Sequence, residues 1–277
     1  MPKPGWCGRG GKPELPELPD VQYFVDYFNS NCPGRNIKQV DIVESSLVMK
    51  GTPLKINEAL VGKEFSTAWR RGKLMIVETA GDPNKLILQY GMTGDLKYGR
   101  STELSAGDKK YARLIVKFQN GYELLWINVR KFGRVYFVRD INDVSILKTM
   151  GPEPLELTPD QFLELLQEHV TKNIKSFLMD QSDIAGIGNE YSNEILFQAG
   201  IDPHHTIDAL GEEKRRDLYQ TTERVLEQGI AAKPGPLPDD WLTAHKDGMK
   251  CPKDGNHRLT KETIAGRSAV FCPKHQH

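Results

Sequence analysis

The chain has 277 residues, enough for a sizeable hydrophobic core and for two or three structural units. Lysine plus arginine and aspartate plus glutamate both total 37, so any attraction to an acidic polymer has to come from local clustering of charge. The sequence contains no long apolar run and no signal peptide, which argues against a membrane protein and predicts a cytoplasmic, reducing location for its four cysteines.

The N-terminal half is predicted to be mostly strand. The first fifteen residues are rich in Gly, Pro and Lys and are predicted to form a disordered extension. A helix is predicted next, because Val21, Phe24, Val25 and Phe28 recur at the spacing of one helix face. Strands are then predicted over residues 37–43, 65–79, 85–98, 111–118, 122–128 and 134–138, with a hairpin turn at Asn120-Gly121. This amount of strand favours a sandwich or a barrel.

The C-terminal half is predicted to be helical. Thr158 and Pro159 are suited to the N-cap and first position of a helix, and further helices are predicted over residues 173–180, 189–199 and 211–229. A Pro-rich linker over residues 233–238 leads to a short terminal module.

Two patterns are typical of phosphate binding, although each has a purely structural explanation. Between residues 109 and 134 there are seven basic residues and one acidic residue, and such a run is more often a solvated sheet face. Gly186 and Gly188 precede a predicted helix, where open N–H groups beside Lys175 and Asn189 can hold a phosphate. A glycine-rich turn between two packed helices explains these two glycines equally well.

Six motifs occur in one order along the chain. They are Pro16-Glu17-Leu18-Pro19-Asp20-Val21, Arg70-Arg71-Gly72-Lys73, Gly91-Met92-Thr93-Gly94, Arg130-Lys131-Phe132-Gly133, Gly151-Pro152-Glu153-Pro154-Leu155 and Gly186-Ile187-Gly188-Asn189-Glu190-Tyr191. From Pro16 to the C-terminus the chain resembles the formamidopyrimidine-DNA glycosylase and endonuclease VIII family. Six motifs in register are far more specific than any one of them.

The resemblance implies an α+β fold: an N-terminal two-sheet β-sandwich, a helix–two-turn–helix domain and a C-terminal zinc-finger hairpin. The expected parts are the extension (1–15), the catalytic domain (16–150), the DNA-binding domain (151–232), the linker (233–248) and the hairpin (249–277). The implied partner is double-stranded DNA with damaged bases or abasic sites, bound by a monomer. Such enzymes flip the damaged base out of the duplex, because its sugar cannot be reached inside the stack.

The same resemblance implies roles for individual residues. Pro16 is expected to attack the sugar C1′ carbon with its amine, Glu17 to protonate the sugar ring oxygen, and Lys73 to lie beside the nucleophile and a phosphate. Three further residues are expected to fill the space left by the flipped base, namely Met92, Arg130 and Phe132. Lys175, Asn189 and Arg267 are expected to contact phosphates.

The terminal module departs from the four-cysteine pattern of the family. It contains Cys251 and Asp254, then His257, and a second pair in Cys272 and His275. Structural zinc sites prefer Cys and His to carboxylates, so the predicted ligands of a structural Zn²⁺ are Cys251, His257, Cys272 and His275. A hairpin without zinc, held by packing alone, is the alternative.

Two other departures affect the activity. Pro16 is a nucleophile only as a free amine, so a protein in which it follows Leu15 is predicted to bind lesions or abasic sites without cleaving them. Pro13 opens a similar motif but lies out of register with the predicted helix. The stretch from Gly229 to Cys251 is also shorter than the family's loop over flipped 8-oxoguanine, which favours ring-opened purines, oxidised pyrimidines and abasic sites as substrates. A general nucleic-acid-binding module is the third hypothesis.

Overall fold

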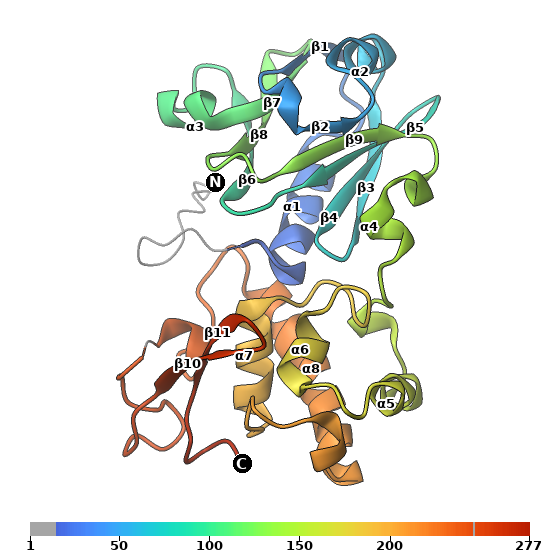
Figure 1. The fold of residues 1–277 in the computed structure, drawn as a ribbon. Coiled ribbons are helices and arrows are strands. Elements are labelled where there is room, and N and C mark those ends of the chain that lie inside the picture. Colours follow the sequence, from blue (N-terminus) through green and yellow to red (C-terminus); the bar gives the residue numbers. More distant parts are fainter. Residues whose placement is uncertain (1–14, 246) are drawn as a thin grey trace. The chain divides into compact units, whose positions relative to one another are not determined.

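The computed structural model describes residues 15–245 and 247–277, which form two compact units (Figure 1). The N-terminal unit holds residues 15–16 and 20–149, and the helical unit holds residues 17–19 and 150–277. Apart from Leu15, the extension predicted over residues 1–15 lies outside the described residues. Residues 17–19 were predicted with the N-terminal domain but pack with the helical unit.

The N-terminal unit contains two sheets. The five-stranded sheet has the strand order β2 (Val48–Lys50), β9 (Arg134–Val138), β5 (Asp82–Gln89), β4 (Leu74–Thr79) and β3 (Phe65–Arg71). The four-stranded sheet has the order β1 (Ile37–Ile42), β7 (Ala112–Phe118), β8 (Tyr122–Asn128) and β6 (Gly94–Arg100). Neighbouring strands are antiparallel except for β2 and β9.

One hydrophobic core joins the two sheets to α1 (Leu18–Asn31). The predicted apolar face of α1 is buried, since Val21, Phe24, Val25 and Phe28 are each at most 3% exposed. They pack with buried side chains of both sheets, among them Trp126. The two-sheet sandwich is therefore confirmed. Shorter helices complete the unit: α2 (Pro53–Leu60), α3 (Ala106–Tyr111) and α4 (Ser145–Lys148).

Two predicted strands are each divided in the structure. The segment 65–79 is a hairpin, in which Arg71 pairs with Leu74 across a two-residue turn. Gly72 adopts φ +54° there, which a side-chain-bearing residue rarely does. The segment 85–98 is two strands, β5 and β6, which belong to different sheets. Helices α2, α3 and α4 and strand β2 were not predicted.

The helical unit is built from α5 (Pro159–Glu168), α6 (Ile174–Met179), α7 (Asn189–Gln198) and α8 (Glu212–Ala232). Thr158 caps α5 as predicted, accepting the Gln161 N–H at 3.3 Å while the Gln161 side chain accepts the Thr158 N–H at 2.9 Å. Strands β10 (Thr260–Ile264) and β11 (Arg267–Phe271) form the C-terminal hairpin. The 3-10 segments of the two units are Ser45–Leu47, Ile141–Asp143, Pro154–Glu156, Ile207–Ala209 and Leu242–Ala244.

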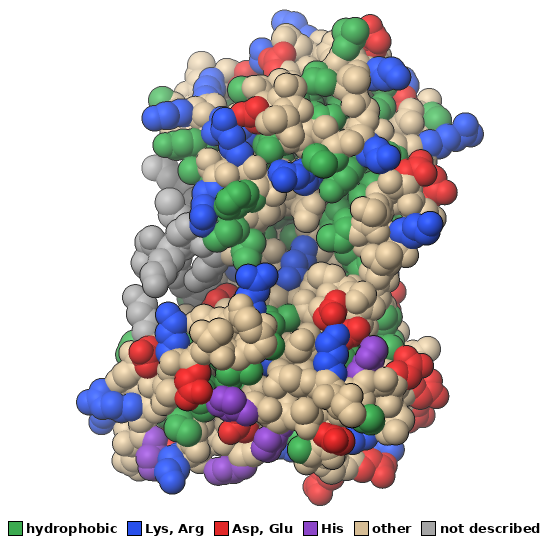
Figure 2. All heavy atoms as spheres, viewed as in Figure 1, with side chains coloured by type: hydrophobic (Ala, Val, Ile, Leu, Met, Phe, Trp, Pro, Cys, Tyr) green, Lys and Arg blue, Asp and Glu red, His purple; other side chains and the backbone are tan. Residues whose placement is uncertain are grey.

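Helix α5 has an acidic outer face. Asp160, Glu164 and Glu168 are exposed on it, and Figure 2 shows acidic side chains gathered over this helix. Such a face repels phosphate, so α5 does not offer a surface for an acidic polymer. No helix within the described residues is long and apolar enough to cross a membrane.

A buried carboxyl group anchors the segment that follows α8. Glu194 of α7 is 0% exposed and accepts hydrogen bonds from Gln198 Nε2 at 2.8 Å and from the Thr243 N–H at 3.2 Å. Burial raises its pKa from 4.5 to about 7, with Asp240 adding to the rise. Near neutral pH, both the protonated and the ionised form of Glu194 are therefore populated.

We expect the contribution of Glu194 to stability to fall as pH rises from about 4.5 to about 7, because the unfolded chain releases this proton in that range while the folded protein retains it. The variant Glu194→Gln lacks this dependence, so relative to wild type it should gain about 1–3 kcal/mol between pH 5 and pH 8. Urea unfolding of both proteins at the two pH values measures the difference. An identical offset at pH 5 and pH 8 would show that Glu194 does not titrate in this range.

Candidate active site

Glu17 is held at the N-terminus of α7. Its side chain is 2% exposed. Oε2 accepts the backbone N–H groups of Gly188 at 2.7 Å and Tyr191 at 3.2 Å, and Oε1 accepts that of Glu190 at 2.9 Å. N–H donors at a helix N-terminus stabilise negative charge on a carboxylate that accepts them. Glu17 is therefore a fixed proton acceptor next to Pro16 in the chain.

The turn before α7 fits closely around the residues that follow Pro16. The Leu18 N–H donates to the Gly186 carbonyl at 2.9 Å, and Gly186 adopts φ +85°. A Cβ atom at Gly186 would lie 2.8 Å from the Leu18 side chain, so the close approach requires glycine. Pro16 itself is buried, and Leu15 is 45% exposed.

Lys175 of α6 is fully buried beneath the same turn. Its Nζ donates to Asn189 Oδ1 and Ser192 Oγ at 3.1 Å each and to Asn193 Oδ1 at 2.5 Å. Burial lowers its pKa to about 8, although two nearby carboxylates oppose that shift. The structure thus places Lys175 and Asn189 together, but a phosphate reaches this amine only by replacing one of its present acceptors.

Lys73 lies at the tip of the β3–β4 hairpin, not within a strand as the sequence suggested. It follows Gly72, whose carbonyl accepts a bond from Arg70 Nη1 at 3.0 Å. Arg70 Nε also donates to Gln22 Oε1 of α1 at 3.3 Å. These bonds hold the hairpin tip beside the early part of α1, in the unit that also contains Pro16.

Met92, Arg130 and Phe132 come together at two of the loops that join the sheets. Residues 90–93 connect β5 to β6, and residues 129–133 connect β8 to β9. The Arg130 guanidinium lies 3.5 Å from Met92 Sδ and 5.0 Å from the centre of the Phe132 ring. Phe132 is 50% exposed. We call these three side chains the loop cluster.

Asn128, which the sequence analysis did not single out, and Gly91 of the third motif hold the loops together. Asn128 is buried, donates from Nδ2 to the Tyr90 carbonyl and accepts the Gly133 N–H at 3.3 Å. Gly91 leaves room for the opposite loop, because a Cβ atom there would lie 2.5 Å from the Phe132 carbonyl carbon. The available signal for Asn128 was an asparagine directly after the apolar residues 124–127.

The basic run between residues 109 and 134 is partly neutralised within its own unit. Lys109, Lys117 and Lys131 pair with carboxylates, namely Glu123 at 3.9 Å, Asp41 at 2.8 Å and Glu44 at 2.5 Å. Only Arg113, Lys117 and Arg134 of this run lie on strands, so the run does not form one sheet face. Arg267 is exposed at the start of β11, directly after the hairpin turn.

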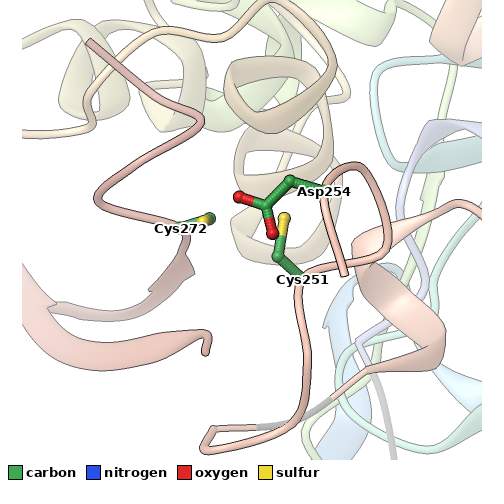
Figure 3. A group of neighbouring side chains, drawn as sticks. All are labelled: Cys251, Asp254 and Cys272. Atoms are coloured by element: carbon green, nitrogen blue, oxygen red, sulfur yellow. The ribbon is translucent and has the colours of Figure 1, made fainter. Parts of the chain in front are cut away.

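A cluster that can hold a metal ion lies beside the C-terminal hairpin. Sγ of Cys251, Sγ of Cys272 and a carboxylate oxygen of Asp254 all lie within 4.8 Å of one another (Figure 3). Both cysteines are buried, and burial raises the pKa of the Cys251 thiol. Two sulfur ligands and one oxygen suit zinc, which takes four such ligands in a structural site.

Neither predicted histidine belongs to this cluster. His257 Nδ1 lies 2.7 Å from Asp254 Oδ2, so the ring contacts the carboxylate of this cluster. His275 Nε2 lies 2.8 Å from the Phe197 carbonyl oxygen. A carbonyl only accepts, so Nε2 carries the proton and the lone pair of His275 lies on Nδ1. The described cluster thus has Asp254 where the sequence argument placed His257.

The fold and this site define a helix–two-turn–helix protein with an N-terminal sandwich, and comparisons specify its family. The model of the formamidopyrimidine-DNA glycosylase N-terminal domain matches residues 15–135, and that of the formamidopyrimidine-DNA glycosylase H2TH domain matches residues 150–237. The chain belongs to the formamidopyrimidine-DNA glycosylase family, as the sequence motifs indicated.

Individual relatives match over most of their length. The formamidopyrimidine-DNA glycosylase of Lactococcus lactis is 31% identical over 94% of this chain and 98% of its own. That of Arabidopsis thaliana is 30% identical over 95% of this chain and 71% of its own. The crystal structure of the L. lactis protein with DNA containing an abasic site superposes with a TM-score of 0.82 at 27% identity, covering 94% of this chain and 99% of the other.

Proposed function

We propose that this protein is a base-excision DNA glycosylase that also cleaves the strand at abasic sites. The observation that carries the proposal is the Glu17 carboxylate, fixed at the N-terminus of α7 and directly following Pro16, in a chain of this family. The substrates are double-stranded DNA with oxidised or ring-opened bases, or with abasic sites. One structural relative was solved with DNA containing a ring-opened, benzylated guanine (TM-score 0.82, 28% identity, 95% of this chain and 100% of the other).

The chemistry follows from an amine beside a proton acceptor. The Pro16 nitrogen forms a bond to C1′ as the bond between C1′ and the base breaks, and the base leaves with the electron pair and takes up a proton. Glu17 accepts the amine proton and gives it to the sugar ring oxygen as the C1′–O bond opens, which yields an iminium. Loss of a C2′ proton then expels the 3′ phosphate, and a second elimination expels the 5′ phosphate. Lys73 is proposed to lie beside a phosphate flanking the lesion.

This reaction needs Pro16 as a free secondary amine. An amide nitrogen has no available lone pair, so the active form begins at Pro16 and lacks the preceding residues. The family match supports this proposal, because it starts at residue 15, one position before Pro16. Removal of the earlier residues by trimming, or initiation at the Leu15 codon followed by loss of methionine, gives such a chain.

The remaining site residues are proposed to hold the DNA. The loop cluster enters the space of the flipped base, with Phe132 as the exposed apolar wedge and Arg130 as a donor to the orphaned base. Lys175, Asn189 and Arg267 contribute phosphate contacts. The proposed functional parts remain the catalytic domain (16–150), the DNA-binding domain (151–232), the linker (233–248) and the hairpin (249–277).

A structural zinc ion is proposed for the C-terminal hairpin. Cys251 and Cys272 supply thiolates. His275 is proposed as a further ligand, because its backbone N–H donates to the Cys272 carbonyl at 3.1 Å and the lone pair of its ring lies on Nδ1. The ion, when bound, stabilises the hairpin and takes no part in the chemistry.

Strand-cleavage assays on defined duplexes test the function. Protein that begins at Pro16 should excise ring-opened guanine and oxidised pyrimidines and nick abasic sites, and should act more slowly on 8-oxoguanine. Tight binding to abasic DNA without any cleavage would support the lesion-binding alternative. Equal affinity for intact and abasic duplexes would leave only a general DNA-binding module.

The loop cluster gives a further prediction. Phe132→Ala should slow base excision from duplex DNA by about tenfold or more, because the wedge offsets an unstacking cost of a few kcal/mol. Cleavage of an abasic site in single-stranded DNA should change much less, since no base pair has to be opened there. Single-turnover rates on both substrates measure the contrast, with Leu54→Ala, an exposed apolar residue of α2, as the control. Equal losses on the two substrates would contradict the wedge role.

A further inference from the structure

We propose that Asp254 is a direct ligand of the metal ion held by Cys251 and Cys272, and that His257 positions the Asp254 carboxylate without binding the ion. This rests on the proposed zinc site and replaces the ligand set expected from the sequence. With Asp254 as a ligand, the metal centre contains a carboxylate oxygen and differs from a centre built on cysteine and histidine alone.

The first support is the grouping of the three side chains. Cys251, Asp254 and Cys272 direct their ligand atoms toward one another, within 4.8 Å (Figure 3). Ligands of one tetrahedral zinc ion, with bonds of about 2.0–2.3 Å, lie roughly 3–4 Å apart, so a small contraction completes the arrangement. Both sulfur atoms belong to buried residues, where an unpaired thiolate would be costly. A cation bound at this position would therefore stabilise the two buried thiolates.

The second support is that Asp254 is held in place by its own loop. Asp254 Oδ1 accepts the backbone N–H groups of Asn256 at 2.8 Å and His257 at 2.9 Å. The loop is closed by bonds from the Gly255 N–H to the Cys251 carbonyl and from the Cys251 N–H to the His257 carbonyl, both at 2.8 Å. These contacts hold the Asp254 carboxylate close to Cys251, so it can bind an ion without a large movement of the loop.

The third support concerns the proton of His257. Its Nδ1 lies 2.7 Å from Asp254 Oδ2, and an ionised carboxylate only accepts. Nδ1 therefore carries a hydrogen, and the lone pair of the ring lies on Nε2, which is not among the ligand atoms that lie within 4.8 Å of one another. A hydrogen bond from a neighbouring residue orients a ligating carboxylate, and loss of such a partner typically weakens metal binding.

Cobalt(II) in place of zinc distinguishes the two residues. Each thiolate adds charge-transfer absorption in the near ultraviolet, so the intensity per cobalt counts the sulfur ligands. Asp254→Cys should raise that intensity by about half, as two thiolate ligands become three. His257→Cys, the matched variant three residues away, should leave it unchanged. An increase with His257→Cys, or none with Asp254→Cys, overturns the assignment.

Two further variants keep the test independent of folding defects. His257→Gln should weaken zinc binding by roughly 10–100-fold in a competition with a chelating dye while leaving the cobalt spectrum per bound ion unchanged. Asp254→Asn should lower the affinity at least as much, and an affinity equal to wild type would contradict a ligand role. Failure of the wild-type chain to bind zinc or cobalt refutes the metal site itself, whereas the strand-cleavage assay tests base excision separately.

Discussion

Protein that begins at Pro16 should cleave an abasic-site duplex faster than protein in which Leu15 precedes Pro16, by on the order of 10³-fold or more. The physical reason is the nitrogen itself. As a free secondary amine it has a lone pair for C1′, and as an amide it does not. Single-turnover cleavage of the two proteins under identical conditions measures the ratio.

The matched control for this comparison is Pro16→Gly in the protein that begins at position 16. Glycine supplies a primary α-amine, so this variant should remain measurably active but slower than proline. Binding to the abasic duplex should be similar for all three proteins, which separates loss of chemistry from loss of affinity. Equal cleavage by the proteins with and without Leu15 would show that another group is the nucleophile.

Glu17→Gln should lower cleavage by about 10²–10⁴-fold, the range typical of a lost proton-transfer group. The glutamine amide keeps the size of the side chain but cannot accept and return the proton. It also puts an NH₂ group against N–H donors of α7, so the thermal midpoint should fall as well.

Two controls separate the chemical and structural effects of Glu17. Glu213→Gln, an exposed carboxylate in the first turn of α8, should leave both rate and stability close to wild type. Glu17→Asp retains a carboxylate and should recover part of the rate if proton transfer is the role. Cleavage by Glu17→Gln within a fewfold of wild type would exclude Glu17 from the chemistry.

The parts of the fold that depend on local pattern could be predicted from the sequence. The apolar face of α1 follows from the spacing of Val21, Phe24, Val25 and Phe28, and the capping of α5 follows from Thr158 and Gln161. Both depend on residues within one or two helical turns of each other. The hairpin at Gly121 was likewise predicted, and Gly121 adopts φ +81° between β7 and β8.

The parts that depend on distant partners could not be predicted. Residues 85–98 were predicted as one strand, whereas in the structure they belong to two sheets, with Gly91 packed closely against Phe132 of the opposite loop. The burial of Lys175 was also not visible, because its three acceptors lie on a different helix. Lysine usually indicates a surface position, and tertiary packing overrides that preference here.

The candidate site shows the same division. The order of the motifs located Pro16, Glu17 and the loop cluster, because the resemblance carries their register. The arrangement of the metal residues depends on side-chain geometry, since Asp254 and His257 are both suitable ligands by type. Only the structure shows that the Asp254 carboxylate lies near both sulfur atoms and that the His257 ring contacts this carboxylate.

The proposed reaction depends on a bond between the Pro16 nitrogen and the sugar. Borohydride reduces an iminium to a stable amine, so protein that begins at Pro16 can be trapped on an abasic-site duplex, digested and examined by mass spectrometry. We expect a deoxyribose remnant on the N-terminal peptide, attached at Pro16. A remnant on Lys73 or another lysine, or no trapped complex at all, would contradict it.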